Sequence, residues 1–153
     1  LAKNGRTGLC DITIYPSKLI ALNDKIHSSA YPGVNCDNLP FFVPIATQAS
    51  GATLIHDWMY ENRAIYFTEL NRLGANIVLA DQHRAFIYGP TKMKGNEVVC
   101  PPALRPAMMV LVAMLSAKGQ SILRNVYSIN RGYENIAKRL NAIGASVALL
   151  NDF

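Results

Sequence analysis

The sequence has 153 residues and a mass of 16.8 kDa, and half of its residues are hydrophobic, so it can form one well-buried core. We expect a single domain over residues 1–153. No apolar stretch reaches the ~20 residues that a membrane-spanning helix needs, and we expect no membrane partner. The sequence begins with Leu1 rather than Met, which leads us to expect a piece of a longer protein.

The net charge of +5 comes entirely from the second part of the chain. Residues 1–89 hold seven basic and seven acidic side chains, whereas residues 90–153 hold eight basic and three acidic ones. Such an imbalance attracts anions. Aromatic residues are not interleaved with the basic ones as base stacking requires, so we expect a small anion and not nucleic acid.

The three cysteines and three histidines form no recognisable ligand or disulfide pattern. An odd number of widely separated cysteines favours reduced thiols in the cytoplasm over disulfide bonds. The histidines have no carboxylate or cysteine at ligand spacing, so we expect no metal. No motif for a cofactor is present, and we expect none.

In the first part of the chain, segments with the pattern of a strand alternate with segments with the pattern of a helix. In chain order it predicts strands over residues 9–15 and 25–30, a helix over 37–50, a strand over 53–57, an amphipathic helix around 66–73, and strands over 76–80 and 85–88. The helices are expected to end before Gly51 and Gly74. Pro44 is expected to kink or break the first of them.

The second part of the chain follows a similar order. It predicts a helix over residues 103–118, a strand over 121–126, an amphipathic helix over 133–143 and a strand over 146–150. The helix over 103–118 is apolar nearly all round, so we expect it to be central. The alternation predicts a layered α/β fold with mixed sheets packed on buried helices.

Two parts of the chain also repeat each other in sequence. The longest match joins LNRLGA at residues 70–75 to LNAIGA at residues 140–145, an offset of 70 residues. Other matches lie at an offset of 68. We therefore expect two copies of one unit, at about residues 37–89 and 103–150.

Two arginines occupy the same place in both copies, because 63 plus 68 is 131. Arg63 and Arg131 each follow an Asn, close to the start of a predicted helix. They could bind an anion together with the N–H groups of the helix N-terminus. Alternatively, the Asn caps the helix and the Arg is a solvated surface charge.

Asp37 and Arg105 correspond in the same way, because 37 plus 68 is 105, and both open the first helix of a copy. Asp37 could cap that helix or act as a general base. Arg105 opposes the helix dipole, so its position indicates a nearby anion. The residues alone leave these alternatives open.

Several strings of residues together resemble one known family. From about Ala30 to the end, their order and spacing are similar to the C-terminal part of the UDP-N-acetylglucosamine 1-carboxyvinyltransferases, a group of enolpyruvyl transferases. The strings are AYPG at residues 30–33, YENR at 60–63, ELNRLGA at 69–75, LR at 104–105 and NRGYE at 130–134. The second and last strings are the most specific, since 5-enolpyruvylshikimate-3-phosphate synthases share the fold but not these strings.

The resemblance implies an inside-out α/β barrel of the enolpyruvyl transferase type. Each of two domains would hold three repeated units with helices buried inside sheets, and this chain would supply about two units. The implied reaction moves the enolpyruvyl group of phosphoenolpyruvate to the 3-hydroxyl of UDP-N-acetylglucosamine in peptidoglycan synthesis. The active cleft would need the N-terminal portion of the same protein, which carries the family's reactive Cys.

The resemblance also assigns roles by position. Asp37 would contact the sugar 3-hydroxyl as the proposed base, and Arg131 would face phosphoenolpyruvate as the second catalytic residue. Arg105 would also bind phosphoenolpyruvate. Met59 would contact the sugar nucleotide through its backbone, and Arg63 would line the cleft.

The sequence departs from the family pattern close to Arg105. Pro102-Ala103 stands where the family usually has Thr-Asp, and PAM at residues 106–108 replaces small polar residues. Two alternatives therefore stay open. One is a diverged enolpyruvyl transferase with another substrate, and the other is a standalone α/β module that binds an acidic metabolite or a protein partner.

Overall fold

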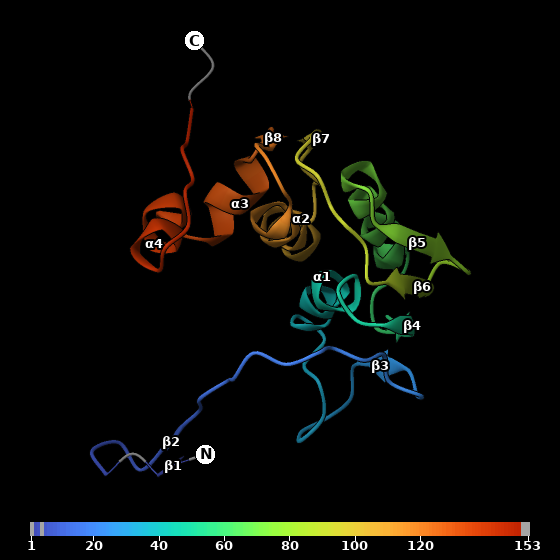
Figure 1. Cartoon of the computed structure of the whole chain (residues 1–153), viewed down its shortest axis with the longest axis vertical. Helices are drawn as coiled ribbons and strands as arrows, with labels where there is room; N and C mark the ends of the chain where they lie inside the picture. Colours follow the sequence, from blue (N-terminus) through green and yellow to red (C-terminus); the bar gives the residue numbers. More distant parts are fainter. Residues whose placement is uncertain (1, 4, 151–153) are drawn as a thin grey trace.

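The computed structural model describes residues 2, 3 and 5–150, and its described elements form three sheets with helices between them (Figure 1). Near the N-terminus, β1 (Ala2–Lys3) and β2 (Cys10–Asp11) form a short antiparallel pair that lies apart from the rest of the molecule. The strand predicted over residues 9–15 is therefore much shorter than expected. No helix in the described part of the chain is long and apolar enough to cross a bilayer.

A four-stranded sheet holds its strands in the order β3-β4-β6-β5. These strands are β3 (Ile26–His27), β4 (Gly51–His56), β5 (Asn76–Leu79) and β6 (Arg84–Gly89). β3 runs parallel to β4, and the other neighbours are antiparallel. The predicted strands over 53–57, 76–80 and 85–88 are confirmed to within two residues, whereas the one over 25–30 is shorter.

The helices beside this sheet differ from their predictions in length and type. They are η1 (Leu39–Phe41), α1 (Phe42–Ala46) and η2 (Arg63–Leu73), where η marks a 3₁₀ helix. The helix predicted over 37–50 thus ends early, at Ala46. Pro44 does not break it, because α1 begins at Phe42 and the N–H groups of a first turn have no helical partner to lose. η2 ends as predicted at Gly74, where φ is 92°.

The second part of the chain forms a smaller parallel pair and three helices. These elements are β7 (Glu97–Val99), α2 (Leu104–Ser116), β8 (Ile122–Arg124), α3 (Tyr127–Gly132) and α4 (Ile136–Ala142). The sequence did not predict β7 or α3, and α4 is shorter than the helix predicted over 133–143. The strand predicted over 146–150 is wrong for this structure, because no neighbouring strand is present in the described residues to form a ladder with it.

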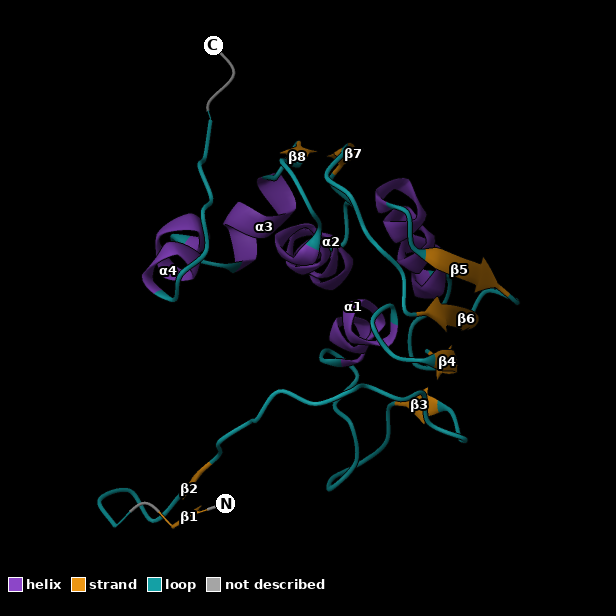
Figure 2. Ribbon diagram, in the orientation of Figure 1, coloured by secondary structure: helices purple, strands orange, loops and turns teal. Residues whose placement is uncertain are grey.

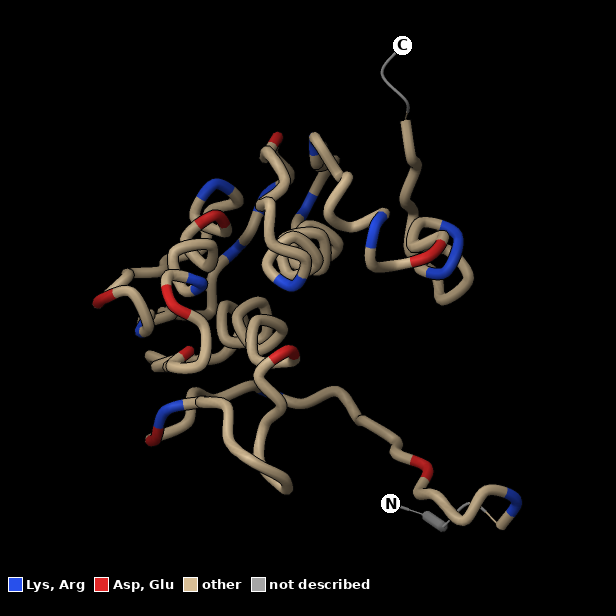
Figure 3. The backbone as a smooth tube through the Cα atoms, turned by 180° about the vertical axis from the view of Figure 1, so that it is seen from behind, with Lys and Arg blue, Asp and Glu red and all other residues tan. Residues whose placement is uncertain are grey.

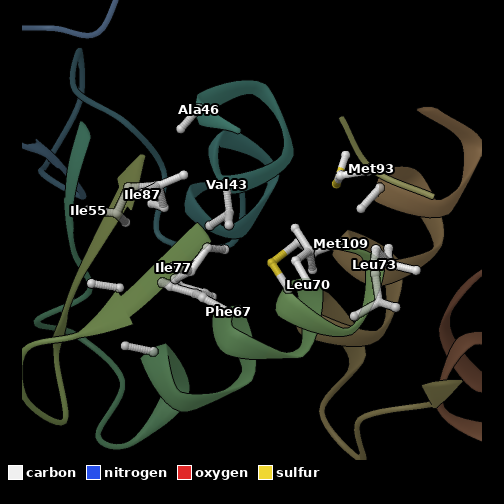
Figure 4. Close-up of a cluster of buried hydrophobic side chains, with 14 of the residues drawn as sticks. Val43, Ala46, Ile55, Phe67, Leu70, Leu73, Ile77, Ile87, Met93 and Met109 are labelled. Carbon is white, nitrogen blue, oxygen red and sulfur yellow. The ribbon is translucent and has the colours of Figure 1, made fainter. Parts of the chain in front are cut away.

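The core lies around α2, as predicted. This helix packs against η1, α1, η2 and α3, and seven of its residues are buried. Figure 2 shows α1 and α2 in the middle of the molecule, with the strands of the four-stranded sheet and of the β7-β8 pair on the outside. In the core, Phe67 and Ile77 meet Val43 beneath the sheet (Figure 4), and each such buried side chain contributes roughly 1.5–3 kcal/mol to stability.

Backbone contacts reveal structural equivalence between the two parts. Ser50 donates from its N–H to the Leu19 carbonyl at 2.9 Å, and Lys118 donates in the same way to Met93 at 3.0 Å. Ser50 and Lys118 are 68 residues apart, which is the offset read from the sequence. We refer below to residues 26–89 as the first unit and to residues 97–150 as the second unit. The assignment of the whole chain to one domain stays a prediction.

Candidate functional site

Asp37 and Arg105, which correspond in the repeat, contact each other. Arg105 Nη2 donates a hydrogen bond to Asp37 Oδ2 at 3.1 Å. Asp37 lies two residues before η1 and Arg105 lies in the first turn of α2, so the ion pair joins the two units. The Asp37 side chain is 43% exposed and the Arg105 side chain 32%, so a solute in water can reach both.

Tyr133 holds the other side of the Arg105 guanidinium. Arg105 Nη1 donates to the Tyr133 hydroxyl at 3.1 Å, and the guanidinium carbon lies 5.8 Å from the centre of the Tyr133 ring. Partial burial lowers the pKa of Arg105, but the hydrogen bonds to Asp37 and Tyr133 outweigh this and raise it. Arg105 is therefore a fixed positive charge between a carboxylate and a phenol.

The charge of Asp37 also acts on Tyr60, whose ring lies against the Arg63 guanidinium. The negative charge of Asp37 is the largest cause of a raised pKa at Tyr60, followed by the neighbouring Cys36 thiol. Its hydroxyl therefore stays protonated and can donate a hydrogen bond. We call Asp37, Tyr60, Arg105 and Tyr133 the Asp37 cluster.

Arg63 lies next to this cluster but is committed to a buried ion pair. Its Nε donates to Asp57 Oδ2 at 2.5 Å and its Nη2 donates to Asp57 Oδ1 at 2.8 Å, with Asp57 fully buried. The same Nη2 donates to the Cys36 carbonyl at 2.7 Å, and the guanidinium carbon lies 4.0 Å from the centre of the Tyr60 ring. The geometry gives Arg63 a supporting role: it fixes the residue before Asp37 and the ring of Tyr60.

Met59 and Arg131 lie on exposed surface. Met59 is 51% exposed in the turn after β4, one residue before Tyr60. Arg131 is in the last turn of α3 rather than at the start of a helix, two residues before Tyr133. Its side chain makes no hydrogen bond or ion pair within residues 2, 3 and 5–150. The structure thus joins Asp37 and Arg105 directly, and brings Met59 and Arg131 near the cluster only through neighbours in sequence.

The capping alternatives do not match the structure. η1 begins after Asn38, without a side-chain cap, so Asp37 is not its cap. Asn62 precedes η2 in a left-handed conformation, with φ 59°, and also makes no side-chain cap. Asn130 lies inside α3. The side chain of Asp37 is thus available for an interaction other than capping.

The arrangement offers one carboxylate, one guanidinium and two phenols, a set suited to accepting a proton and binding an anion. Burial raises the pKa of the Cys100 thiol to about 11, so this Cys is no ready nucleophile. The described residues contain no group of three side chains placed to hold a metal ion. Figure 3 shows Lys and Arg spread along the second unit rather than gathered at one point.

Asp57, Tyr60 and Tyr133 are the three contributors that sequence reasoning missed. Tyr133 stands inside the NRGYE string, two residues after Arg131, and could have been noticed there. Asp57 ends a predicted strand six residues before Arg63. An acidic residue at the end of an apolar strand is a signal that a basic partner is close.

Residues 7–140 match the family model described as EPSP synthase (3-phosphoshikimate 1-carboxyvinyltransferase). The chain belongs to this family. It is 42% identical over 125 residues to the UDP-N-acetylglucosamine 1-carboxyvinyltransferase of Treponema denticola, covering 82% of this chain and 29% of the relative. It is also 42% identical over 128 residues to the protein of the same name from Porphyromonas gingivalis, with the same two coverages.

A solved structure is similar over most of the chain. The enolpyruvyl transferase NikO from Streptomyces tendae superimposes with a TM-score of 0.72 and 27% identity, covering 86% of this chain and 30% of NikO. This likeness confirms the predicted enolpyruvyl transferase fold. The chain spans about 29% of the length of the curated relatives it matches.

Proposed function

We propose that this chain is part of a cytoplasmic enolpyruvyl transferase. The reaction moves the enolpyruvyl group of phosphoenolpyruvate to the 3-hydroxyl of UDP-N-acetylglucosamine and releases phosphate, for peptidoglycan synthesis. The observation that supports the proposal is the Asp37–Arg105 ion pair, in which a carboxylate and a guanidinium are one hydrogen bond apart in a member of this family.

Asp37 is the proton acceptor in this proposal. The sugar hydroxyl forms a bond to the enolpyruvyl carbon only as it loses its proton, and a carboxylate within hydrogen-bond reach can take it. The exposure of Asp37 leaves room for a substrate hydroxyl beside it. Tyr60 can donate a hydrogen bond to a sugar or phosphate oxygen from the same side.

Arg105 and Arg131 bind phosphoenolpyruvate, whose phosphate and carboxylate carry its negative charge. One N–H of Arg105 donates a hydrogen bond to Asp37. A bound anion that accepts a hydrogen bond from this N–H instead leaves the Asp37 oxygen free to accept a proton. Exposed Arg131 supplies a second guanidinium. Arg63 positions the residue before Asp37 and the ring of Tyr60. Met59 contacts the sugar nucleotide through its backbone.

The remaining half of the cleft belongs to the N-terminal portion of the same protein in this proposal. A second candidate function is a diverged enolpyruvyl transferase with another acceptor. The start of α2 favours it, because its N-cap is Ala103 and makes no side-chain hydrogen bond, where the family usually has Asp. The likeness to NikO, named an enolpyruvyl transferase, is compatible with both candidates.

A phosphate-release assay tests the proposal. The chain alone should release no phosphate above background from phosphoenolpyruvate and UDP-N-acetylglucosamine, because half of the cleft is outside it. A full-length protein that carries this sequence should release phosphate only when both substrates are present. Turnover by the chain alone would refute the proposal that the chain is only part of the enzyme. If the full-length protein turns over only with an acceptor other than UDP-N-acetylglucosamine, the diverged enzyme is favoured.

A further inference from the structure

Arg105 has two hydrogen-bond partners, and a bound anion competes with only one of them. Nη2 donates to Asp37 of the first unit, and Nη1 donates to Tyr133 of the second unit. A phosphate or carboxylate accepts the same charge-assisted hydrogen bond as the Asp37 carboxylate, so it can replace Asp37. The Tyr133 hydroxyl is a neutral acceptor on the other nitrogen. It can therefore keep its bond to Arg105 while Asp37 and the anion exchange.

Tyr133 is anchored in the second unit by contacts of its own. It follows the last residue of α3, and its N–H donates to the Ile129 carbonyl at 2.8 Å. Its ring packs against a buried cluster that includes Ala107 and Met108 of α2 and Ile129 of α3. None of these contacts involves Asp37. The place of the phenol beside Arg105 is therefore independent of whether Asp37 is paired.

The end of α3 lies close against the start of α2, and a glycine makes this approach possible. Gly132 precedes Tyr133, and Leu104 precedes Arg105. A Cβ atom at position 132 would lie 2.5 Å from Leu104 Cδ2 and 2.6 Å from Leu104 Cδ1. With Leu104 where it is, only a residue without a side chain fits between the two helices. The contact brings the residues that follow it, Arg105 and Tyr133, within hydrogen-bond reach of each other.

We propose that Tyr133 is a positioning residue for Arg105: its hydroxyl holds the guanidinium in place while Arg105 exchanges Asp37 for the phosphate or carboxylate of phosphoenolpyruvate. This inference rests on the function proposed above. A side chain that is held in advance loses less conformational freedom when its ligand binds. Without the hydroxyl, Asp37 would be the remaining hydrogen-bond partner of Arg105 among the described residues. An anion would then have to displace that partner and also order the freed side chain.

Tyr133→Phe in a full-length protein that carries this sequence tests the proposal. Phe lacks the hydroxyl but keeps the ring, so the packing of the ring and its contact with the guanidinium remain. The affinity for phosphoenolpyruvate, measured by titration calorimetry without an acceptor, should fall by about 10-fold or more, as expected for one hydrogen bond to a charged group. The KM for phosphoenolpyruvate should rise by a similar factor with kcat close to that of the wild type, because the hydroxyl acts on binding. The melting temperature should not change.

Tyr127→Phe is the matched control, because Tyr127 opens the same helix and is 74% exposed. It should leave the affinity and the melting temperature as they are. Tyr133→Leu also removes the ring, so it should weaken binding at least as much as Tyr133→Phe and lower the melting temperature as well.

Two results would overturn the positioning role of Tyr133. One is an affinity for phosphoenolpyruvate that is equal in the wild type and Tyr133→Phe, whatever happens to the melting temperature. The other is a wild-type protein that binds no phosphoenolpyruvate. The titration is separate from turnover: a wild type that binds phosphoenolpyruvate but transfers nothing to UDP-N-acetylglucosamine would refute the proposed function, and the comparison with Tyr133→Phe would still decide this inference.

Discussion

Arg63→Ala should destabilise the chain strongly, because it leaves a buried carboxylate without its partner. Asp57 is 0% exposed, and both of its oxygens accept hydrogen bonds from Arg63. Removing one member of a buried pair typically costs about 3–5 kcal/mol, since the remaining charge has no water around it. In a chain of this length each kcal/mol moves the melting temperature by roughly 2–4 °C, so we expect a drop of roughly 10 °C.

Urea unfolding followed by circular dichroism measures this loss. Arg72→Ala is the matched control, because the Arg72–Glu69 ion pair lies on the surface, with the Arg72 side chain 64% exposed. Its removal should cost no more than about 0.5 kcal/mol. Arg63→Lys keeps the charge but cannot donate to both carboxylate oxygens from one planar group, so its loss should fall between the two. If Arg63→Ala proves no more costly than Arg72→Ala, the buried pair does not hold this part of the fold.

In the full-length protein, Arg131→Ala should raise the KM for phosphoenolpyruvate or slow its turnover while leaving the melting temperature unchanged, because Arg131 is exposed; unaltered kinetics would make Arg131 a solvated charge only. Hydrogen bonds from the Arg84 side chain and from the His83 and Arg84 N–H groups lower the pKa of Asp81 from 3.8 to about 2. The folded pKa is the lower one, so the stability from these bonds is complete above about pH 4 and is lost as the pH falls toward 2. Asp81→Asn should remove this acid dependence, as urea unfolding between pH 2 and 5 can measure; a carboxyl that titrates near 3.8 by NMR would contradict it.

The sequence repeat identified Asp37 and Arg105 as equivalent positions, but it did not predict that the two side chains form an ion pair. An offset of 68 residues placed Asp37 and Arg105 at the start of the same helix in two units, and the dipole argument predicted an anion near Arg105. That anion is the carboxylate of Asp37 itself. The sequence could not reveal this, because it does not say how two copies of a unit sit against each other.

The other misses have local physical causes. β-strand propensity is present at residues 146–150, but a strand exists only through a neighbour, and the neighbour is absent from the described residues. The sequence pattern around Arg63 is that of a surface or substrate-binding arginine. In the structure Arg63 is instead buried, in an ion pair with Asp57. Hydrophobic periodicity places helices and strands well, but it does not identify the partner of a buried charge.

Asp37→Asn in the full-length protein tests the central claim most directly. Asn keeps the size of the side chain and an oxygen that can still accept from Arg105, so the melting temperature should barely move. It removes the basic oxygen that takes the proton of the sugar hydroxyl. Turnover of phosphoenolpyruvate with UDP-N-acetylglucosamine should therefore fall by ~100-fold or more. Turnover that survives in Asp37→Asn, at an unchanged melting temperature, would contradict the role of Asp37 as the base.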